Sequence, residues 1–253
     1  MDPDVRDSAD GMLTRADRLL HAFDESHRRL SLATLVERSG LPRSTTHRTA
    51  SQMVALGWLG RRNGYYHVGD GLFEAASLAP ARSDLRDVVL PYMQDLHEAT
   101  RLTVQLGVLD GLDVILTEKI TGHFQHRALN RVGSRLPAYA SSLGRAILAY
   151  SPPEVVQPVL DGPHPARTRY TITSAEVLER ELVAIPDRGW AVDREEGNLG
   201  LSCVGAPVID PFKGVVAALS VTGPTSRVQP ENLGPLVRIT AAAASRALNG
   251  RFG

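Results

Sequence analysis

The sequence lacks the features that mark several large classes of protein. It contains a single cysteine, Cys203, which excludes an internal disulfide and suits a reducing compartment. No apolar run approaches the roughly 18 residues that a membrane-spanning helix needs, and the acidic start, MDPDVRDSADG, is unlike a basic and apolar signal sequence. Aromatic residues make up only 5% of the chain, which disfavours a surface that stacks single-stranded bases. We therefore expect a cytoplasmic protein with no membrane partner.

Complete catalytic motifs are also missing. Residues 97–101 read HEATR, so arginine stands where the HExxH zinc motif needs its second histidine, and residues 200–204 read GLSCV, without the final glycine of a nucleophile elbow. His123 and His126 lack a clear third metal ligand, so an ordinary polar role is favoured for them. We expect no enzyme, no metal and no cofactor. A small-molecule-processing enzyme with an accessory nucleic-acid-binding domain is the alternative.

Charge is balanced over the whole chain but is unevenly distributed. Lys+Arg and Asp+Glu both number 28. Between Arg28 and His67, Glu37 is the only acidic residue. The basic residues of this stretch are Arg28, Arg29, Arg38, Arg43, Arg48, Arg61 and Arg62. Such a local positive field is typical of a DNA-facing surface.

The same stretch shows the order of signals of a helix-turn-helix. Ser31 fits the N-cap of a short helix, and Gly40 fits the position just beyond its end. Pro42 fits the first turn of a second helix, because its missing N–H would be unpaired there anyway. A DNA-binding domain is therefore expected around these two helices.

The second helix carries most of the residues that we expect to contact DNA. The residues predicted to face a core are Ala50, Met53, Val54 and Leu56. The first turns of this helix are polar and basic. In a recognition helix, the N-terminal turns are the part that enters the major groove. The predicted contacts are Arg43, Ser44, Thr45, Thr46, His47 and Arg48.

A β-hairpin wing is predicted directly after this helix. Residues 56–59 and 65–68 resemble two short strands, and Asn63-Gly64 favours a hairpin turn. Arg61 and Arg62 lie between the strands and complete the predicted DNA contacts. The aromatic residues expected at core positions of the wing are Trp58, Tyr65 and Tyr66. The structural alternative is a solvated helical face beside an ordinary hairpin.

Length and periodicity indicate two domains. The chain has 253 residues, of which 43% are hydrophobic and 22% charged. Apolar residues recur at helical spacing over three further segments, 13–23, 72–78 and 85–96. We expect a winged helix-turn-helix domain over 1–70 with 1–10 loose, a linker helix over 71–82, and an effector-binding domain over 83–253.

The C-terminal segment mixes strands and helices. The predicted strands are 103–109, 113–120, 125–132, 201–208 and 215–221, and the predicted helices are 143–150, 175–187 and 233–249. Short turns at Asp110-Gly111 and Asp210–Gly214 favour a largely antiparallel sheet with helices packed on it. The expected fold class is α+β.

Four landmarks in this order resemble the IclR (isocitrate lyase regulator) family of transcriptional regulators. They are LATLVERSGLPRSTTHR at 32–48, GYYHVG at 64–69, YASSLGRAILAY at 139–150, and GLSCVGAPVID followed by GVVAALSVTGP over 200–224. The resemblance covers nearly the full chain. It implies a winged helix, a linker helix, a GAF-like α/β effector-binding domain, and homodimers or homotetramers that bind double-stranded operator DNA.

The resemblance also implies an effector pocket. The implied pocket residues are Ser142, Leu143, Asp193, Cys203, Ser220 and Thr222. Backbone N–H groups of Ser142 and Leu143, at a helix start, would meet a ligand carboxylate. Gly144-Arg145 departs from the family's frequent Gly-Lys, and Ser142-Leu143 stands where smaller residues are common.

Each implied pocket residue has a plain alternative. Ser142 would then cap a helix, Asp193 would belong to a surface acidic run that ends at Glu196, and Cys203 would be a small buried side chain. The arginines near the expected pocket favour a small organic acid or aromatic metabolite over a cation, and they are Arg127, Arg131, Arg135 and Arg145. The expected function is sequence-specific DNA binding that this metabolite modulates.

Overall fold

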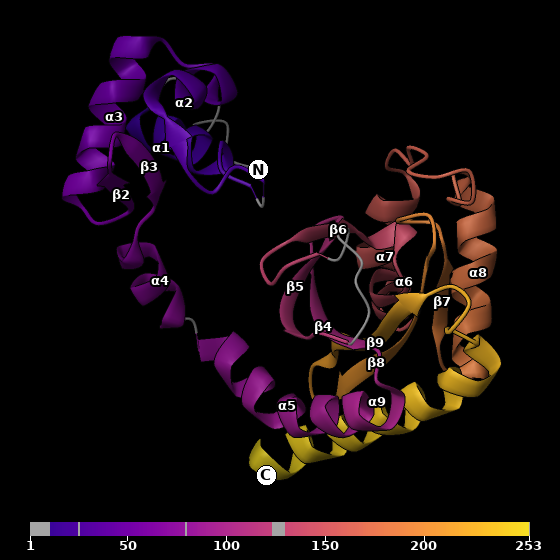
Figure 1. Ribbon diagram of the computed structural model, residues 1–253. Coiled ribbons are helices and arrows are strands. Elements are labelled where there is room, and N and C mark those ends of the chain that lie inside the picture. Colours follow the sequence, from indigo (N-terminus) through magenta and orange to yellow (C-terminus); the bar gives the residue numbers. More distant parts are fainter. Residues whose placement is uncertain (1–10, 25, 79, 123–129, 253) are drawn as a thin grey trace. The chain divides into compact units, whose positions relative to one another are not determined.

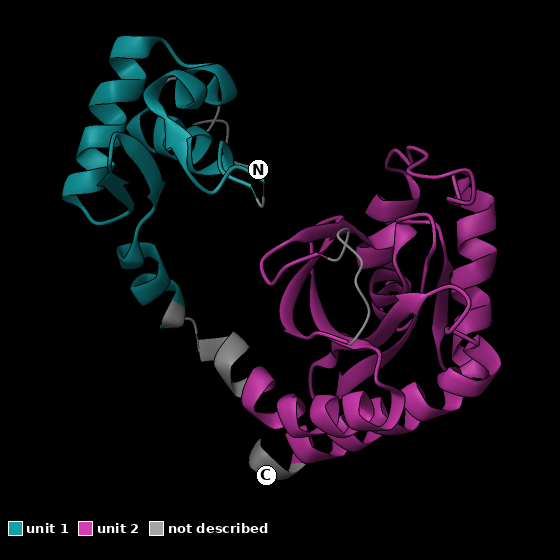
Figure 2. Ribbon diagram, in the orientation of Figure 1, with its two compact units in different colours: residues 1–80 teal, residues 81–253 magenta. Residues whose placement is uncertain are grey.

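The chain folds into two compact units, unit 1 over Met1–Pro80 and unit 2 over Ala81–Gly253 (Figure 2). The computed structural model describes residues 11–24, 26–78, 80–122 and 130–252. The segment 1–10 and the histidines His123 and His126 lie outside the described residues, as does most of the predicted strand 125–132. In the described part of the chain, no helix is both long enough and apolar enough to span a membrane.

Unit 1 contains a helical core and a small antiparallel sheet (Figure 1). Its helices are α1 (Met12–His21), α2 (Leu32–Ser39), α3 (Arg43–Ala55) and α4 (Asp70–Ser77). Its strands are β1 (Leu30–Ser31), β2 (Leu59–Arg62) and β3 (Tyr65–Val68), in the order β1-β3-β2. The core is formed by Leu19, Leu35, Ala50, Met53, Leu59 and Tyr66, among others.

The turn between α2 and α3 follows from three local signals. Ser31 caps α2, because its Oγ accepts a hydrogen bond from the backbone N–H of Thr34 at 3.1 Å. Gly40 ends α2 in the left-handed region, with φ at 65°. Pro42 is the N-cap of α3, one residue before the helical turn in which the sequence placed it.

The wing differs from its prediction in register. The first strand is β2 at Leu59–Arg62 and not 56–59, so Arg61 and Arg62 lie within the strand. Asn63 and Gly64 both have positive φ, 53° and 81°, which is the type I′ geometry that matches strand twist. The two-residue strand β1 was missed because so short a segment has no detectable period.

Two residues that were predicted to be buried are exposed. Leu56 is 64% exposed because it is the C-cap of α3, beyond the buried stripe of that helix. Tyr65 is 50% exposed, because successive strand residues point to opposite faces and its neighbour Tyr66 takes the core position.

Unit 2 is built on a six-stranded antiparallel sheet in the order β6-β5-β4-β9-β8-β7. The strands are β4 (Thr103–Asp110), β5 (Asp113–Ile120), β6 (Arg135–Pro137), β7 (Ala191–Arg194), β8 (Leu201–Asp210) and β9 (Gly214–Pro224). The helices are α5 (Pro80–Thr100), α6 (Ser142–Leu148), α7 (Pro153–Leu160), α8 (Ala175–Arg188) and α9 (Pro230–Phe252), with a 3₁₀ turn, η2, at Ala138–Ala140.

The two faces of this sheet carry separate hydrophobic cores. Helices α5 and α9 cover one face, and α6, α7 and α8 lie on the other (Figure 1). Val104, Leu106, Leu219 and Val221 point toward α5 and α9. The residues between them in β4 and β9 therefore point toward α6, as the two-residue period of a strand requires.

Most of the predicted elements of unit 2 are present, and three elements, α7, β6 and β7, were missed. The strand at Asp113–Ile120 has the predicted bounds. Residues 130–132, in the predicted strand 125–132, are not a strand, and the edge strand β6 begins at Arg135 instead. Proline interrupts the pattern of α7 at Pro158, and β6 and β7 are too short to show an alternation.

Candidate functional site

The outward face of α3 carries most of the predicted DNA contacts. Arg43, Ser44, His47 and Arg48 are exposed, and Thr45 is half-buried. The prediction that Thr46 contacts DNA is wrong, because this residue is fully buried and its Oγ1 donates to the carbonyl of Leu41 at 3.3 Å. This threonine holds the turn before α3 and cannot reach DNA.

Two further exposed residues of α3 were not predicted as contacts. Ser51 and Gln52 are exposed and follow Arg48 by three and four residues, so all three share one helical face. The signal was available in the sequence, because the buried stripe of this helix is spaced three and four residues apart at Thr46, Thr49, Ala50 and Met53.

The wing presents its arginines in different ways. Arg61 and Arg62 are both exposed. The Arg61 guanidinium lies 5.3 Å from the ring centroid of Tyr66, which is buried in the core of unit 1. This cation–π contact restricts Arg61. The wing therefore presents two exposed arginines in β2, of which Arg61 packs on the buried ring of Tyr66 and Arg62 follows it in the strand.

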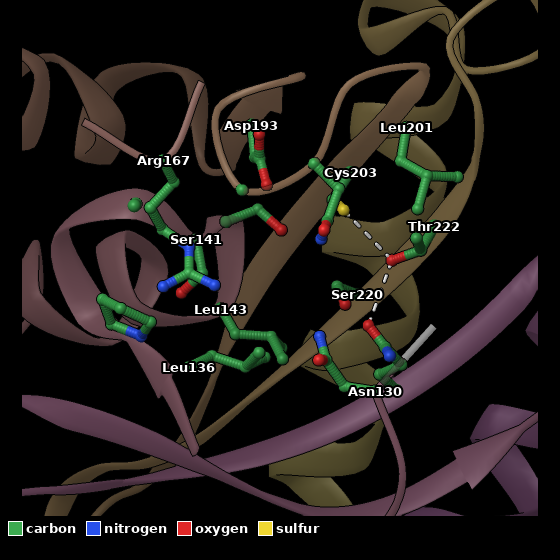
Figure 3. Close-up of a pocket in the computed structure, with 16 residues that line it drawn as sticks. Asn130, Leu136, Ser141, Leu143, Arg167, Asp193, Leu201, Cys203, Ser220 and Thr222 are labelled. Atoms are coloured by element: carbon green, nitrogen blue, oxygen red, sulfur yellow. Dashed lines mark hydrogen bonds between the residues drawn. The ribbon is translucent and has the colours of Figure 1, made fainter. Parts of the chain in front are cut away.

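A pocket in unit 2 lies over the centre of the sheet, at the start of α6. The register pairs Gln105 with Ser220 and Cys203 with Thr222, so these four side chains share the face toward α6. Its other polar lining residues are Asn130, Ser141, Ser142, Arg167, Asp193 and Asn198. All six residues that the family resemblance implied therefore line a single pocket (Figure 3).

Hydrogen bonding within the pocket is incomplete. Thr222 Oγ1 lies 3.1 Å from Gln105 Oε1 and 3.2 Å from Cys203 Sγ, and both contacts are drawn in Figure 3. The hydroxyl proton of Thr222 can serve Gln105 while the Cys203 thiol donates to the Thr222 oxygen, so these two contacts can form together. Ser220 Oγ is buried and has no partner among the described residues. An unpaired buried hydroxyl is unfavourable, so a ligand atom that pairs with it would gain affinity.

The start of α6 closes the pocket. Its N-cap is Ser141, whose Oγ accepts from the Gly144 N–H at 3.1 Å; the cap is therefore not Ser142. The backbone N–H groups of Ser142 and Leu143 have no acceptor among the described residues. A Cβ on Gly144 would lie 2.3 Å from the Ala138 backbone, so only glycine allows this close approach.

Asp193 is buried beside this helix start, and the surface-run alternative for it is wrong. It is 6% exposed, and its carboxylate accepts from the Glu196 N–H at 2.7 Å. Burial raises the pKa of Asp193 to about 6, against the lowering effect of Arg145 and of backbone donors. The pocket therefore contains a carboxyl group that changes charge near neutral pH.

Of the arginines that were expected near the pocket, the three that the structure describes do not line it. Arg145 is fully buried and forms a bidentate ion pair with Glu196, at 2.6 and 2.8 Å. Burial alone would lower the pKa of Arg145, but Glu196 raises it above its ordinary value. Arg135, at the start of β6, pairs with Asp110 at the end of β4. Arg131 is not among the lining residues, and Arg127 lies outside the described residues.

The basic residue that does line the pocket is Arg167, which the sequence analysis missed. It lies between α7 and α8 in a segment without regular structure, so no hydrophobic period marked it. Gln105 was also missed, although its place in a predicted strand beside Val104 and Leu106 indicated the opposite face of that strand.

The chemistry of Cys203 does not fit a nucleophile. Burial, reinforced by the neighbouring carboxyl of Asp193, raises the pKa of the Cys203 thiol, whereas a nucleophilic cysteine must be a thiolate. Among the described residues, no cluster of three or more histidine, cysteine or acidic side chains could hold a metal ion.

Known proteins resemble both units. A family model described as "Bacterial transcriptional regulator IclR C-terminal" matches residues 78–247, and "IclR helix-turn-helix domain" matches residues 12–62. The chain is 31% identical to the HTH-type transcriptional regulator XynR of Escherichia coli (strain K12), over 92% of this chain and 95% of the relative. It is 33% identical to the transcriptional repressor IclR of the same organism, over 85% and 81%.

A solved structure agrees with this relationship. An IclR homologue from Microbacterium hydrocarbonoxydans, complexed with 4-hydroxybenzoate, has a TM-score of 0.86 to this chain at 31% identity. The alignment covers 95% of this chain and 100% of that one. The likeness therefore extends over both units.

The pKa of Asp193 predicts a pH-dependent effect of replacing it with asparagine. Because the folded pKa is about 6 against an ordinary 3.8, the unfolded chain loses this proton first, and wild-type stability falls as pH rises through that interval. Asparagine does not titrate. The free energy of unfolding of Asp193→Asn relative to wild type should therefore rise by about 2–3 kcal/mol from pH 4 to pH 7.

The measurement is urea unfolding followed by Trp190 fluorescence in a Trp58→Phe background, since each unit contains one of the two tryptophans. The control is Asp187→Asn, which removes an exposed carboxylate from α8 and leaves the pocket intact. Parallel pH profiles for wild type and Asp193→Asn would contradict the assignment.

Proposed function

This chain belongs to the IclR family of bacterial transcriptional regulators, and from that premise we propose that a small organic acid in the unit 2 pocket controls its operator binding. The protein is a DNA-binding regulator of transcription with a helix-turn-helix domain. Its proposed DNA contacts are Arg43, Ser44, Thr45, His47, Arg48, Arg61 and Arg62. Because its proposed partner is operator DNA, we propose that the protein acts in the cytoplasm.

The observation that carries the effector proposal is the buried hydroxyl of Ser220, which has no partner among the described residues and lies in a polar pocket. The free space inside is about 50 Å³, on a scale where one water molecule needs roughly 10–15 Å³. A compact occupant fits this space. The homologue with bound 4-hydroxybenzoate makes that compound the first candidate to test.

Control of DNA binding requires that the ligand distinguish two states of the protein. A metabolite shifts the equilibrium only if it binds the operator-competent arrangement and the other arrangement with different affinities. Either repression or activation satisfies this condition. An enzyme is the disfavoured alternative, because the relatives are regulators and the raised thiol pKa of Cys203 opposes covalent catalysis.

DNA binding should depend on the exposed arginines of α3 and the wing. Alanine at an arginine that contacts phosphate should weaken binding to every duplex and reduce the salt slope by about one unit. An arginine that reads a base should instead cost roughly 1–3 kcal/mol at one base pair. Fluorescence anisotropy with a labelled duplex at several salt concentrations measures both effects.

The quadruple variant of Arg43, Arg48, Arg61 and Arg62 to alanine is the decisive one. Arg180→Ala, at an exposed position on α8 in unit 2, is the control and should keep the wild-type slope. Unchanged duplex binding by the quadruple variant would refute the assignment of these arginines as DNA contacts.

We also propose a homodimer or homotetramer as the working unit. One winged helix covers too little DNA for physiological affinity, so half-sites about one helical turn apart call for two copies. Phe73 is 77% and Leu78 80% exposed at the end of unit 1. The apolar face of α5 is used inside unit 2 by Leu85, Val89 and Met93, so it is not available for a contact between subunits.

Light scattering should show at least a dimer at micromolar concentration. Phe73→Asp should weaken the association of the subunits, because a charge would replace an exposed apolar side chain. A strictly monomeric wild type, both alone and with DNA, would refute the assembly proposal.

Replacement of Ser220 by alanine should separate ligand binding from stability. The hydroxyl has no partner among the described residues, so its removal should leave the unfolding free energy unchanged or slightly higher. The same change should reduce ligand affinity by on the order of 1–3 kcal/mol, because a ligand oxygen loses its partner. Thr222→Ala and Cys203→Leu should also weaken binding.

Thermal shift with small organic acids, 4-hydroxybenzoate first, identifies the ligand, and calorimetry then measures the variants. Wild-type affinity in all three variants would place the ligand elsewhere. Loss of folding in all three would return these residues to a structural role.

A further inference from the structure

We propose that Arg167 is the specificity-determining residue of the unit 2 pocket and that it selects ligands with an anionic group. The inference rests on the proposed function of that pocket as the effector site. It names the charge of the ligand and the side chain that reads it, and it replaces the arginines that the sequence had suggested.

The charges of the lining residues point to Arg167. Among the described residues that line the pocket, Arg167 is the only cation and Asp193 the only acid. Arg145 is held by Glu196 in the protein interior, and Arg135 pairs with Asp110 at the end of β4. These two charges are already balanced by acidic partners. A ligand anion that enters the pocket therefore meets the positive charge of Arg167.

The Arg167 guanidinium itself is not committed to another group. In the described part of the chain, no ion pair or side-chain hydrogen bond holds it. Its side chain extends toward the start of α6, near Ser141 and Leu143 (Figure 3). Arg169 differs, because its guanidinium lies 4.8 Å from the ring centroid of Tyr170 and donates to that hydroxyl at 3.0 Å.

The backbone that carries Arg167 is tied to the segment that follows Asp193. Thr168 Oγ1 donates to the carbonyl of Glu195, and Thr171 Oγ1 donates to the carbonyl of Glu196, both at 2.7 Å. These bonds fix the base of the arginine side chain relative to the pocket wall. Less conformational entropy is then lost when the guanidinium closes on a ligand.

The opposite wall specifies the rest of the ligand. Ser220, Thr222 and Cys203 lie across the pocket from the Arg167 guanidinium (Figure 3). Ser220 offers a hydroxyl that has no partner among the described residues, and the Thr222 hydroxyl donates a hydrogen bond to Gln105. A small acid with a hydroxyl or carbonyl oxygen at its other end would satisfy both walls. The ligand class is therefore a compact hydroxy- or oxo-carboxylate.

The test compares acids with their neutral amides. The panel contains 4-hydroxybenzoate, 3-hydroxybenzoate, lactate and glycolate, each paired with its amide, and calorimetry measures binding to the full chain. Wild type should prefer the acids, and this preference should fall with added salt. Arg167→Gln should weaken the acids by about tenfold and leave the amides unchanged, because it removes one charge-assisted hydrogen bond at a partly solvated site.

Two variants control for side-chain loss and for general charge. Arg167→Lys keeps the charge and should recover part of the acid preference, although it lacks the bidentate geometry of arginine. Arg169→Gln removes the neighbouring arginine and should leave both ligand sets at wild-type affinity. A purely structural role for Arg167 would affect acids and amides equally and would not change their salt dependence.

The outcomes separate this inference from the pocket assignment. If ligands bind with sensitivity to Ser220→Ala but Arg167→Gln affects acids and amides alike, the pocket stands and the role of Arg167 is refuted. If an acid loses affinity in Arg167→Gln but keeps wild-type affinity in Ser220→Ala, Thr222→Ala and Cys203→Leu, the assignment of the opposite wall fails and the anion contact stands. If no acid of the panel binds wild type at 10 mM, the anion site is refuted.

Discussion

The antiparallel register of β4, β9 and β8 is the constraint on which unit 2 depends. Because strand residues alternate between faces, one register both buries Val104, Leu219 and Val221 under α5 and α9 and brings the polar side chains of the pocket together on the opposite face. A shift by one residue would exchange the two sets. The same hydrogen-bond ladder therefore specifies both the fold and the site. Because burial of the apolar face fixes the register, it also fixes the positions of the polar side chains on the opposite face.

The buried pair Arg145–Glu196 completes this arrangement beside the pocket. It joins α6 to the segment after β7, and Arg145 also donates to the carbonyl of Val192. Removal of either partner would leave a buried charge without compensation, which is far more unfavourable than the absence of the pair. The pair therefore holds the strand that carries Asp193 against the helix whose first turn closes the pocket.

The sequence predicted the elements with strong periods or strong caps and missed the rest. The helix-turn-helix was predictable because Ser31 and Gly40 act through local geometry, and the wing turn because Asn63-Gly64 tolerates positive φ. Thr46 was misassigned because polarity indicated exposure, whereas its hydroxyl is satisfied by Leu41 inside the core. Arg167 could not be predicted, because it reaches the pocket through tertiary contacts of an irregular segment, and no period in the sequence records those contacts.

The pocket carries interactions that are unfavourable in the absence of a ligand. The buried hydroxyl of Ser220 has no partner in the part of the chain that the structure describes, and the burial of Asp193 opposes its negative charge. Alanine at position 220 would relieve the first effect and asparagine at position 193 the second, so stability alone does not explain these residues. A ligand that pairs with these groups gains affinity for the folded state and stabilises it by mass action. If the two DNA-binding states present the pocket differently, this same gain becomes the free energy that shifts their populations.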